Sequence, residues 1–291
     1  ILTPTVSITA TEVSDGDTST DSGLSMTFKT SHATTDFVVG DISLSNGTLS
    51  SFSGSGTTYT ATLTASAAGG VTVQVAADKF TDGNGNKNEA SDVFNWTYQE
   101  RFISTWVVGD GDYGDGDLTA TLPLVSGGSY NFNVDWGDGN DDDITAYDQA
   151  EVTHTYGSAG TKTVTIDGTI TGWKFAYGGD RSKITLITNW GNLNISTGQA
   201  FDGCTKLNVT ATNAPTISST TLEKTFKHCT ILTSIGNPDQ WDTSGATSMF
   251  QMFRQASEFN QDISGFDTSE VTTFYLMFYL CVKFNQDISS W

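Results

Sequence analysis

The C-terminal third of the chain repeats at a spacing of about 25 residues, and this repeat limits the possible folds more than any other feature. Equivalent phenylalanines stand at intervals of 25, 27 and 25 residues, at Phe201, Phe226, Phe253 and Phe278. A unit this short cannot bury an apolar face alone, so successive units must stack on one another. The repeat therefore predicts a solenoid over residues 171–291.

Within each unit, apolar or small residues stand at i, i+3, i+4 and i+7, a spacing typical of one face of a two-turn α-helix. A further apolar residue follows each stripe and suggests a short extended segment. The strings WDTS and FDTS, at 241–244 and 266–269, then offer Thr or Ser to cap the next helix. We therefore predict an α/β solenoid. The four stripes are Thr197, Ala200, Phe201, Cys204; Leu222, Thr225, Phe226, Cys229; Met249, Met252, Phe253, Ala256; and Phe274, Met277, Phe278, Cys281.

All three cysteines of the chain occupy the last position of a stripe. Cys204, Cys229 and Cys281 hold it in three units, and Ala256 holds it in the remaining one. Exchange of Cys with Ala favours a small buried side chain, so buried free thiols are the first interpretation. A Cys204–Cys229 bridge between adjacent units and a metal site are the alternatives.

Upstream of the repeat, two segments show the period of two that indicates half-buried β-strands. Residues 1–99 contain about seven such runs, with a hairpin signal at Asn46-Gly47, and predict a β-sandwich. After the polar joint at 99–101, residues 100–170 predict a second β module. There Tyr130, Phe132 and Val134 alternate with polar residues.

Several strings carry family resemblances. SDGDTSTDSGLSMTF (14–28) and FTDGNGNKNEASDVFNWTY (80–98) resemble the Ig-like repeats of large bacterial surface proteins. VDWGDG (134–139) with THTYGSAGTKTVTI (153–166) resembles a polycystic-kidney-disease (PKD) type domain, although Lys162 stands where that family usually has an aromatic residue. MFRQASEFNQDISGFDTSEVT (252–272) and AFDGCTKL (200–207) resemble BspA-like leucine-rich-repeat surface proteins, over residues 190–291.

Together these features predict a mainly β chain with three domains: an Ig-like sandwich (1–99), a PKD-like sandwich (100–170) and a leucine-rich-repeat-like α/β solenoid (171–291). The resemblance implies an extracellular location at the cell surface and adhesion to a protein or glycan. It supplies no catalytic residues. The alternative is a structural subunit of a surface layer or filament that contacts copies of itself.

Charge and motif content exclude other classes of function. A net charge of −20, from 33 acidic and 13 basic residues, repels nucleic acid and anionic membranes. No apolar run approaches the roughly 18 residues that span a bilayer. The three histidines lie in different modules, and no nucleophile, zinc or phosphate-loop motif occurs. We therefore expect no enzyme, no nucleic-acid partner and no membrane insertion.

Calcium is the one cofactor that the sequence suggests, because oxygen-rich, sharply turning loops suit hard cations. Neither candidate loop has a complete EF-hand spacing, and the alternative is that Asp, Asn and Gly simply favour tight turns. The first loop offers Asp110, Asp112, Asp115 and Asp117, and the second offers Asp82, Asn84 and Asn86.

A candidate ligand surface lies on the repeats, where Phe250, Tyr275 and Tyr279 stand off the buried stripes and Arg254 lies near them. On a helix, position 250 points about 100° away from the inward position 249. Stacking would bring Phe250 and Tyr275 into register, in a row suited to sugar rings or apolar side chains. The alternative is that a neighbouring coil covers these rings.

The position of Trp291 gives one further expectation. It falls in the slot held by Trp241 and Phe266, at intervals of 25 and 25 residues, where another unit would begin. Since a solenoid end needs a polar cap, we expect the full-length gene product to continue with more units.

Overall fold

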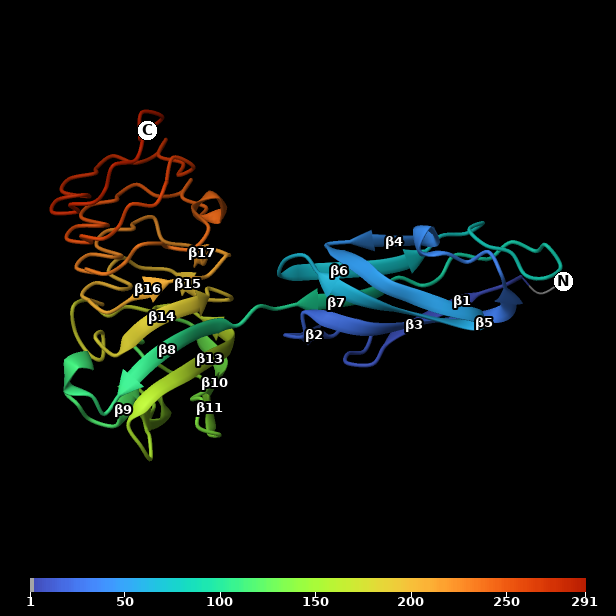
Figure 1. The fold of residues 1–291 in the computed structure, drawn as a ribbon, viewed down its shortest axis with the longest axis horizontal. Helices are drawn as coiled ribbons and strands as arrows, with labels where there is room; N and C mark the ends of the chain where they lie inside the picture. Colours follow the sequence, from blue (N-terminus) through green and yellow to red (C-terminus); the bar gives the residue numbers. More distant parts are fainter. Residues whose placement is uncertain (1–2) are drawn as a thin grey trace. The chain divides into compact units, whose positions relative to one another are not determined.

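The computed structural model describes residues 3–291, which form two compact units, one ending at Gln99 and one spanning Glu100–Trp291. The division falls at the polar joint between the first two predicted modules. Each unit is mainly β (Figure 1). Within the described residues the only helical elements are single 3₁₀ turns.

The first unit is a β-sandwich, as predicted. One sheet has the order β1 (Val6–Ala10), β3 (Gly23–Thr34), β5 (Gly47–Ala65). The other has the order β2 (Thr18–Ser19), β7 (Phe94–Tyr98), β6 (Gly69–Val75), β4 (Ile42–Ser45). The inward residues of the alternating runs, such as Met26, Phe28 and Val73, form one buried core.

The second unit has a six-stranded sheet that extends into the repeats (Figure 1). Its order is β11 (Asp141–Ile144), β10 (Tyr130–Asp135), β13 (Gly160–Ile170), β8 (Phe102–Val108), β14 (Ile184–Asn189), β16 (Asn208–Val209). Two small sheets pair β9 (Thr119–Thr121) with β12 (Thr153–Thr155) and β15 (Asn194–Ile195) with β17 (Thr216–Ile217). One core continues from Phe102 to Cys281. The unit is therefore undivided near residue 170, where the sequence placed a boundary.

The helices predicted in the repeats are not formed. Residues 222–229 instead make consecutive turns, in which Thr225 N–H bonds to Leu222 O and Cys229 N–H bonds to Phe226 O. In each repeat, two residues four positions apart have positive φ, a conformation that interrupts an α-helix. The α/β part of the predicted solenoid is therefore wrong. The positive-φ residues are Gln199, Gly203, Lys224, His228, Gln251, Gln255, Leu276 and Leu280.

Hydrogen bonds between successive coils of the repeat replace those of a helix. Phe226 N–H donates to Met252 O at 2.9 Å, and Phe253 N–H donates to Met277 O at 3.1 Å. Alternate N–H groups thus point to the following coil, whereas an α-helix would use them within one segment. The units stack as irregular coils over residues 197–291, the coil stack, drawn from yellow to red in Figure 1.

The inward side chains of the coils are nevertheless largely those that the spacing predicted. Leu222, Phe226 and Cys229 are fully buried. The four equivalent phenylalanines form a column with successive ring-centroid distances of 5.7, 5.7 and 5.9 Å. The exceptions are Phe274, which is 36% exposed, and Thr197 and Phe278, which are half-buried. Burial in the stack, rather than helix geometry, therefore produced the pattern.

The cysteines are free and buried, which confirms the first interpretation. The Cys229 thiol donates to Phe201 O at 3.2 Å, and the Cys281 thiol donates to Ala256 O at 2.9 Å, so each bonds to the preceding coil. Burial raises the pKa of the Cys281 thiol to about 12. These thiols act as small core side chains with a weak donor, not as a bridge.

Candidate ligand-binding face of the coil stack

The four residues predicted to bind a ligand lie together on neighbouring coils. The Phe250 and Tyr275 rings stack with centroids 5.9 Å apart and an interplanar angle of 13°. The Arg254 guanidinium lies 5.3 Å from the centroid of the Tyr279 ring. Tyr275 is 65% exposed and Tyr279 is 48% exposed. We call these four residues the aromatic face.

The repeat interval explains how the aromatic face assembles. Phe250 and Tyr275 are equivalent positions of successive coils, as are Arg254 and Tyr279. Gln251 N–H donates to Tyr275 O at 3.1 Å, which holds the two coils in this register. The predicted register of Phe250 with Tyr275 is thereby confirmed. Phe250 itself is half-buried, because the Lys224 ammonium and the Tyr275 ring cover it.

Sequence reasoning missed the basic side chains beside these rings. Lys227 is the equivalent of Arg254 in the preceding coil, and His228 N–H donates to Arg254 O at 2.8 Å. The Tyr177 ring lies 4.9 Å from the ring of His228, the residue after Lys227, and the Arg181 guanidinium lies 4.6 Å from the Tyr177 centroid. The 27-residue interval, applied to Arg254, would have identified Lys227.

The first predicted calcium loop is organised by a buried lysine. The Lys183 ammonium, only 1% exposed, bonds to Asp117 at 2.6 Å, Asp115 at 2.9 Å and Asp180 at 3.0 Å. It also donates to Thr119 O at 3.1 Å. Burial alone would lower the pKa of Lys183, but the hydrogen bonds that Lys183 donates to Asp117, Asp115 and Asp180 outweigh it and raise that pKa.

Of the other two carboxylates of this loop, Asp110 makes a local bond. Asp110 accepts the N–H of Asp112 at 2.9 Å at the start of a 3₁₀ turn, Gly111–Tyr113. The Lys183 bond holds the pKa of Asp117 well below its usual range. Lys183 thus supplies positive charge to Asp115 and Asp117, where calcium was expected to do so.

The second predicted calcium loop is closed by one aspartate. Asp82 accepts the N–H groups of Asn84 at 2.8 Å and Asn86 at 2.9 Å, and also the Asn86 side-chain amide at 2.8 Å. The hydrogen bond donated by the Asn86 side-chain amide lowers the pKa of Asp82. This is the tight turn named as the alternative. No group of three or more His, Cys, Asp or Glu within residues 3–291 is arranged to hold a metal ion, and calcium stays a prediction.

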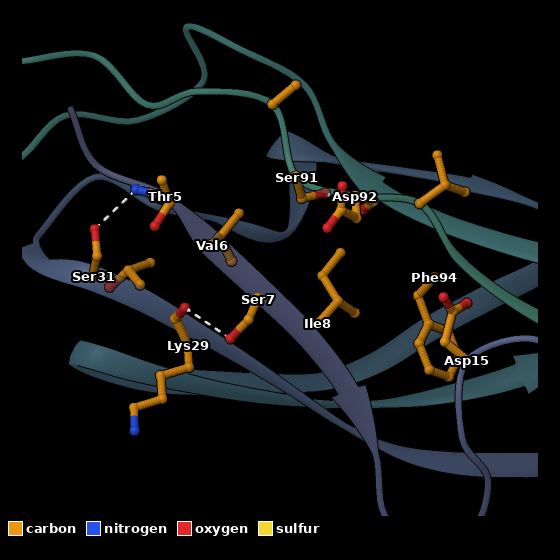
Figure 2. A pocket seen from close by; sticks show the side chains of 13 residues that line it. Thr5, Val6, Ser7, Ile8, Asp15, Lys29, Ser31, Ser91, Asp92 and Phe94 are labelled. Atoms are coloured by element: carbon orange, nitrogen blue, oxygen red, sulfur yellow. Dashed lines mark hydrogen bonds between the residues drawn. The ribbon is translucent and has the colours of Figure 1, made fainter.

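The first unit contains a groove of about 560 Å³ along β1, shown in Figure 2. Val6, Ile8 and Phe94 contribute apolar surface, and Asp15 and Asp92 contribute charge. No residue predicted to bind a ligand or metal lines this groove.

In the described part of the chain, no helix is long and apolar enough to cross a bilayer.

Comparisons with known proteins cover both ends of the chain. Residues 2–98 match the family described as a bacterial Ig-like domain. Residues 187–291 match the family described as a Mycoplasma protein of unknown function, DUF285. No curated protein and no solved structure matches. The first unit is thus similar to bacterial Ig-like domains, and the match over the coil stack names no activity.

Proposed function

We propose that the chain is part of an extracellular surface protein in which β modules display the coil stack, and that the aromatic face binds a protein or glycan. The observation that carries this proposal is the exposure of Tyr275 and Tyr279 beside Phe250 and Arg254. The match of residues 2–98 to bacterial Ig-like domains supports the spacer role. The resemblance of the repeats to BspA-like proteins, and of residues 134–166 to PKD domains, supports the cell surface.

Physical chemistry favours a binding role for these rings. Exposed aromatic side chains lose part of the burial free energy that they would gain in a core, roughly 25 cal/mol per Å². Tyr combines a large apolar surface with a polar tip and little conformational entropy, and it is therefore enriched at interfaces. Arg254 adds a charged donor group above one ring. These properties suit recognition rather than catalysis.

Replacing both Tyr275 and Tyr279 with Ser should weaken ligand binding by about tenfold or more, because two large contact side chains are lost. Stability should change by less than about 1 kcal/mol, since both residues are exposed. Binding to immobilised matrix proteins and glycan arrays measures the first effect, and thermal unfolding measures the second.

Phe250 is left unchanged in this variant, because its ring is half-buried. The matched control is Tyr147→Ser, which removes a tyrosine that is 42% exposed elsewhere in the same unit. It should leave binding intact. Equal binding by the parent and the Tyr275/Tyr279 variant would contradict the proposed face.

The last coil gives a specific reason to keep the structural-subunit alternative. A hollow of about 590 Å³ on it is lined by Phe274, Leu276, Met277, Phe278, Tyr279, Ile288 and Trp291. Leu280 and Val282 lie on the same coil and are exposed. Contact between copies would cover this apolar surface, as would the further units expected after Trp291. Concentration-dependent assembly in sedimentation, lost on Val282→Lys, would favour that alternative, whereas a monomer that binds a foreign ligand favours display.

A further inference from the structure

Four basic side chains gather along the aromatic face of a chain that is otherwise strongly acidic. Although acidic residues outnumber basic ones by 33 to 13, none of the four forms an ion pair within residues 3–291. By contrast, Lys283 on the last coil pairs with Glu258. We call the four residues the cation row: Arg181, Lys224, Lys227 and Arg254.

Two members of the cation row occupy equivalent backbone positions on neighbouring coils. The bond from His228 N–H to Arg254 O places Lys227 and Arg254 at equivalent positions, on backbones that are about 4.8 Å apart in such pairing. Like charges opposite each other destabilise a ladder. Within the described residues neither side chain forms an ion pair with a carboxylate. A bound anion would supply the missing counter-charge.

Ring contacts hold two of these charges beside rings of the aromatic face. The Lys224 ammonium lies 5.5 Å from the Phe250 centroid, and the Arg254 guanidinium lies 5.3 Å from the Tyr279 centroid. Such cation–π contacts restrict where the charged groups can point. Exposed Tyr275 and Tyr279 then continue the row with apolar ring surface. A ligand that matches this surface would carry negative charges and flat apolar ring faces that recur along its length.

We propose that the ligand of this face is an acidic polysaccharide, with uronic-acid carboxylates on the cation row and sugar rings against Tyr275 and Tyr279. This inference rests on the proposed binding function and adds the chemical class of the ligand. An acidic polypeptide would pair with the charges, but its flexible carboxylate side chains offer no ring face to the tyrosines. A neutral glycan would leave Lys227 and Arg254 uncompensated.

The test measures binding of polygalacturonate, neutral galactan and polyglutamate to the whole chain. The parent should bind polygalacturonate at least about tenfold more tightly than either other polymer, and raised salt should weaken that binding because it screens charge. The double variant with Lys227→Gln and Arg254→Gln should bind polygalacturonate about tenfold or more weakly than the parent. The control Lys283→Gln, on the same stack but paired with Glu258, should retain it.

The outcomes separate this inference from the proposed function. Equal binding of galactan, or equal binding of polyglutamate, overturns the acidic-polysaccharide class. If another ligand then binds and depends on Tyr275 and Tyr279, the binding face itself stands. If polygalacturonate binds the parent and the Lys227/Arg254 variant equally, the cation row is not its site. Thermal unfolding of each variant shows whether a loss of affinity reflects a loss of fold.

Discussion

Phe226→Ala is expected to lower the free energy of unfolding of the unit spanning Glu100–Trp291 by about 4 kcal/mol. The Phe226 ring is fully buried and lies 5.7 Å from the ring centroids of both Phe201 and Phe253. Its removal loses the transfer free energy of the ring and leaves a cavity in the middle of the column. Denaturant unfolding, followed by tryptophan fluorescence, measures the change.

Two further variants test the stacked-coil explanation of this effect. Phe226→Leu keeps most of the volume and should cost less than about 2 kcal/mol. Phe278→Ala should cost roughly half as much as Phe226→Ala, because Phe278 is half-buried and has an equivalent ring on one side only. Equal losses at Phe226 and Phe278 would show that stability does not depend on neighbouring coils.

The sequence predicted which side chains the coils bury, but not their backbone. The spacing i, i+3, i+4 and i+7 places one face inward in an α-helix, and the consecutive turns of this stack place the same face inward. Lys224 and His228 adopt positive φ, yet neither is a glycine or asparagine that would signal it. The backbone forms consecutive turns rather than an α-helix because of its hydrogen bonds to the next coil, which depend on tertiary contacts.

The register of Phe250 with Tyr275 was predictable because it depends on the repeat interval alone. The boundary near residue 170 was not, because the sheet crosses the change in composition through β14 and β16. The ion cluster of Lys183 could not be predicted from the local sequence either. Two of its partners, Asp115 and Asp117, lie more than 60 residues earlier in the chain, and a single lysine beside an apolar strand has no periodic signal.

Lys183→Met is expected to destabilise the same unit by about 3 kcal/mol at neutral pH. The substitution keeps a long apolar stem but leaves Asp115, Asp117 and Asp180 facing one another without the ammonium. Asp115 and Asp117 are about half exposed, so water relieves part of the cost. Thermal and denaturant unfolding measure the loss, with Lys283→Met, at an exposed pair, as the control.

The pH dependence of this loss follows from the directions of the pKa shifts. The pKa of Asp117 is depressed in the folded state, so its stabilisation is present above the ordinary Asp value of about 4 and is lost as pH falls below it. The pKa of Lys183 is raised, so its stabilisation is present below about pH 10 and is lost only above that. Parent and variant should therefore differ most between these limits and converge in acid.

Added calcium distinguishes the ion cluster from the predicted metal site. With the ammonium gone, Asp115, Asp117 and Asp180 would offer oxygen ligands to a cation, so excess calcium should raise the melting temperature of Lys183→Met. In the parent, the Lys183 ammonium already bonds to all three carboxylates and occupies the position between them, so calcium should have little effect there. An equal rise in both proteins would mean that calcium binds without displacing Lys183, for instance at Asp110 and Asp112, two of the four carboxylates predicted as ligands in this loop.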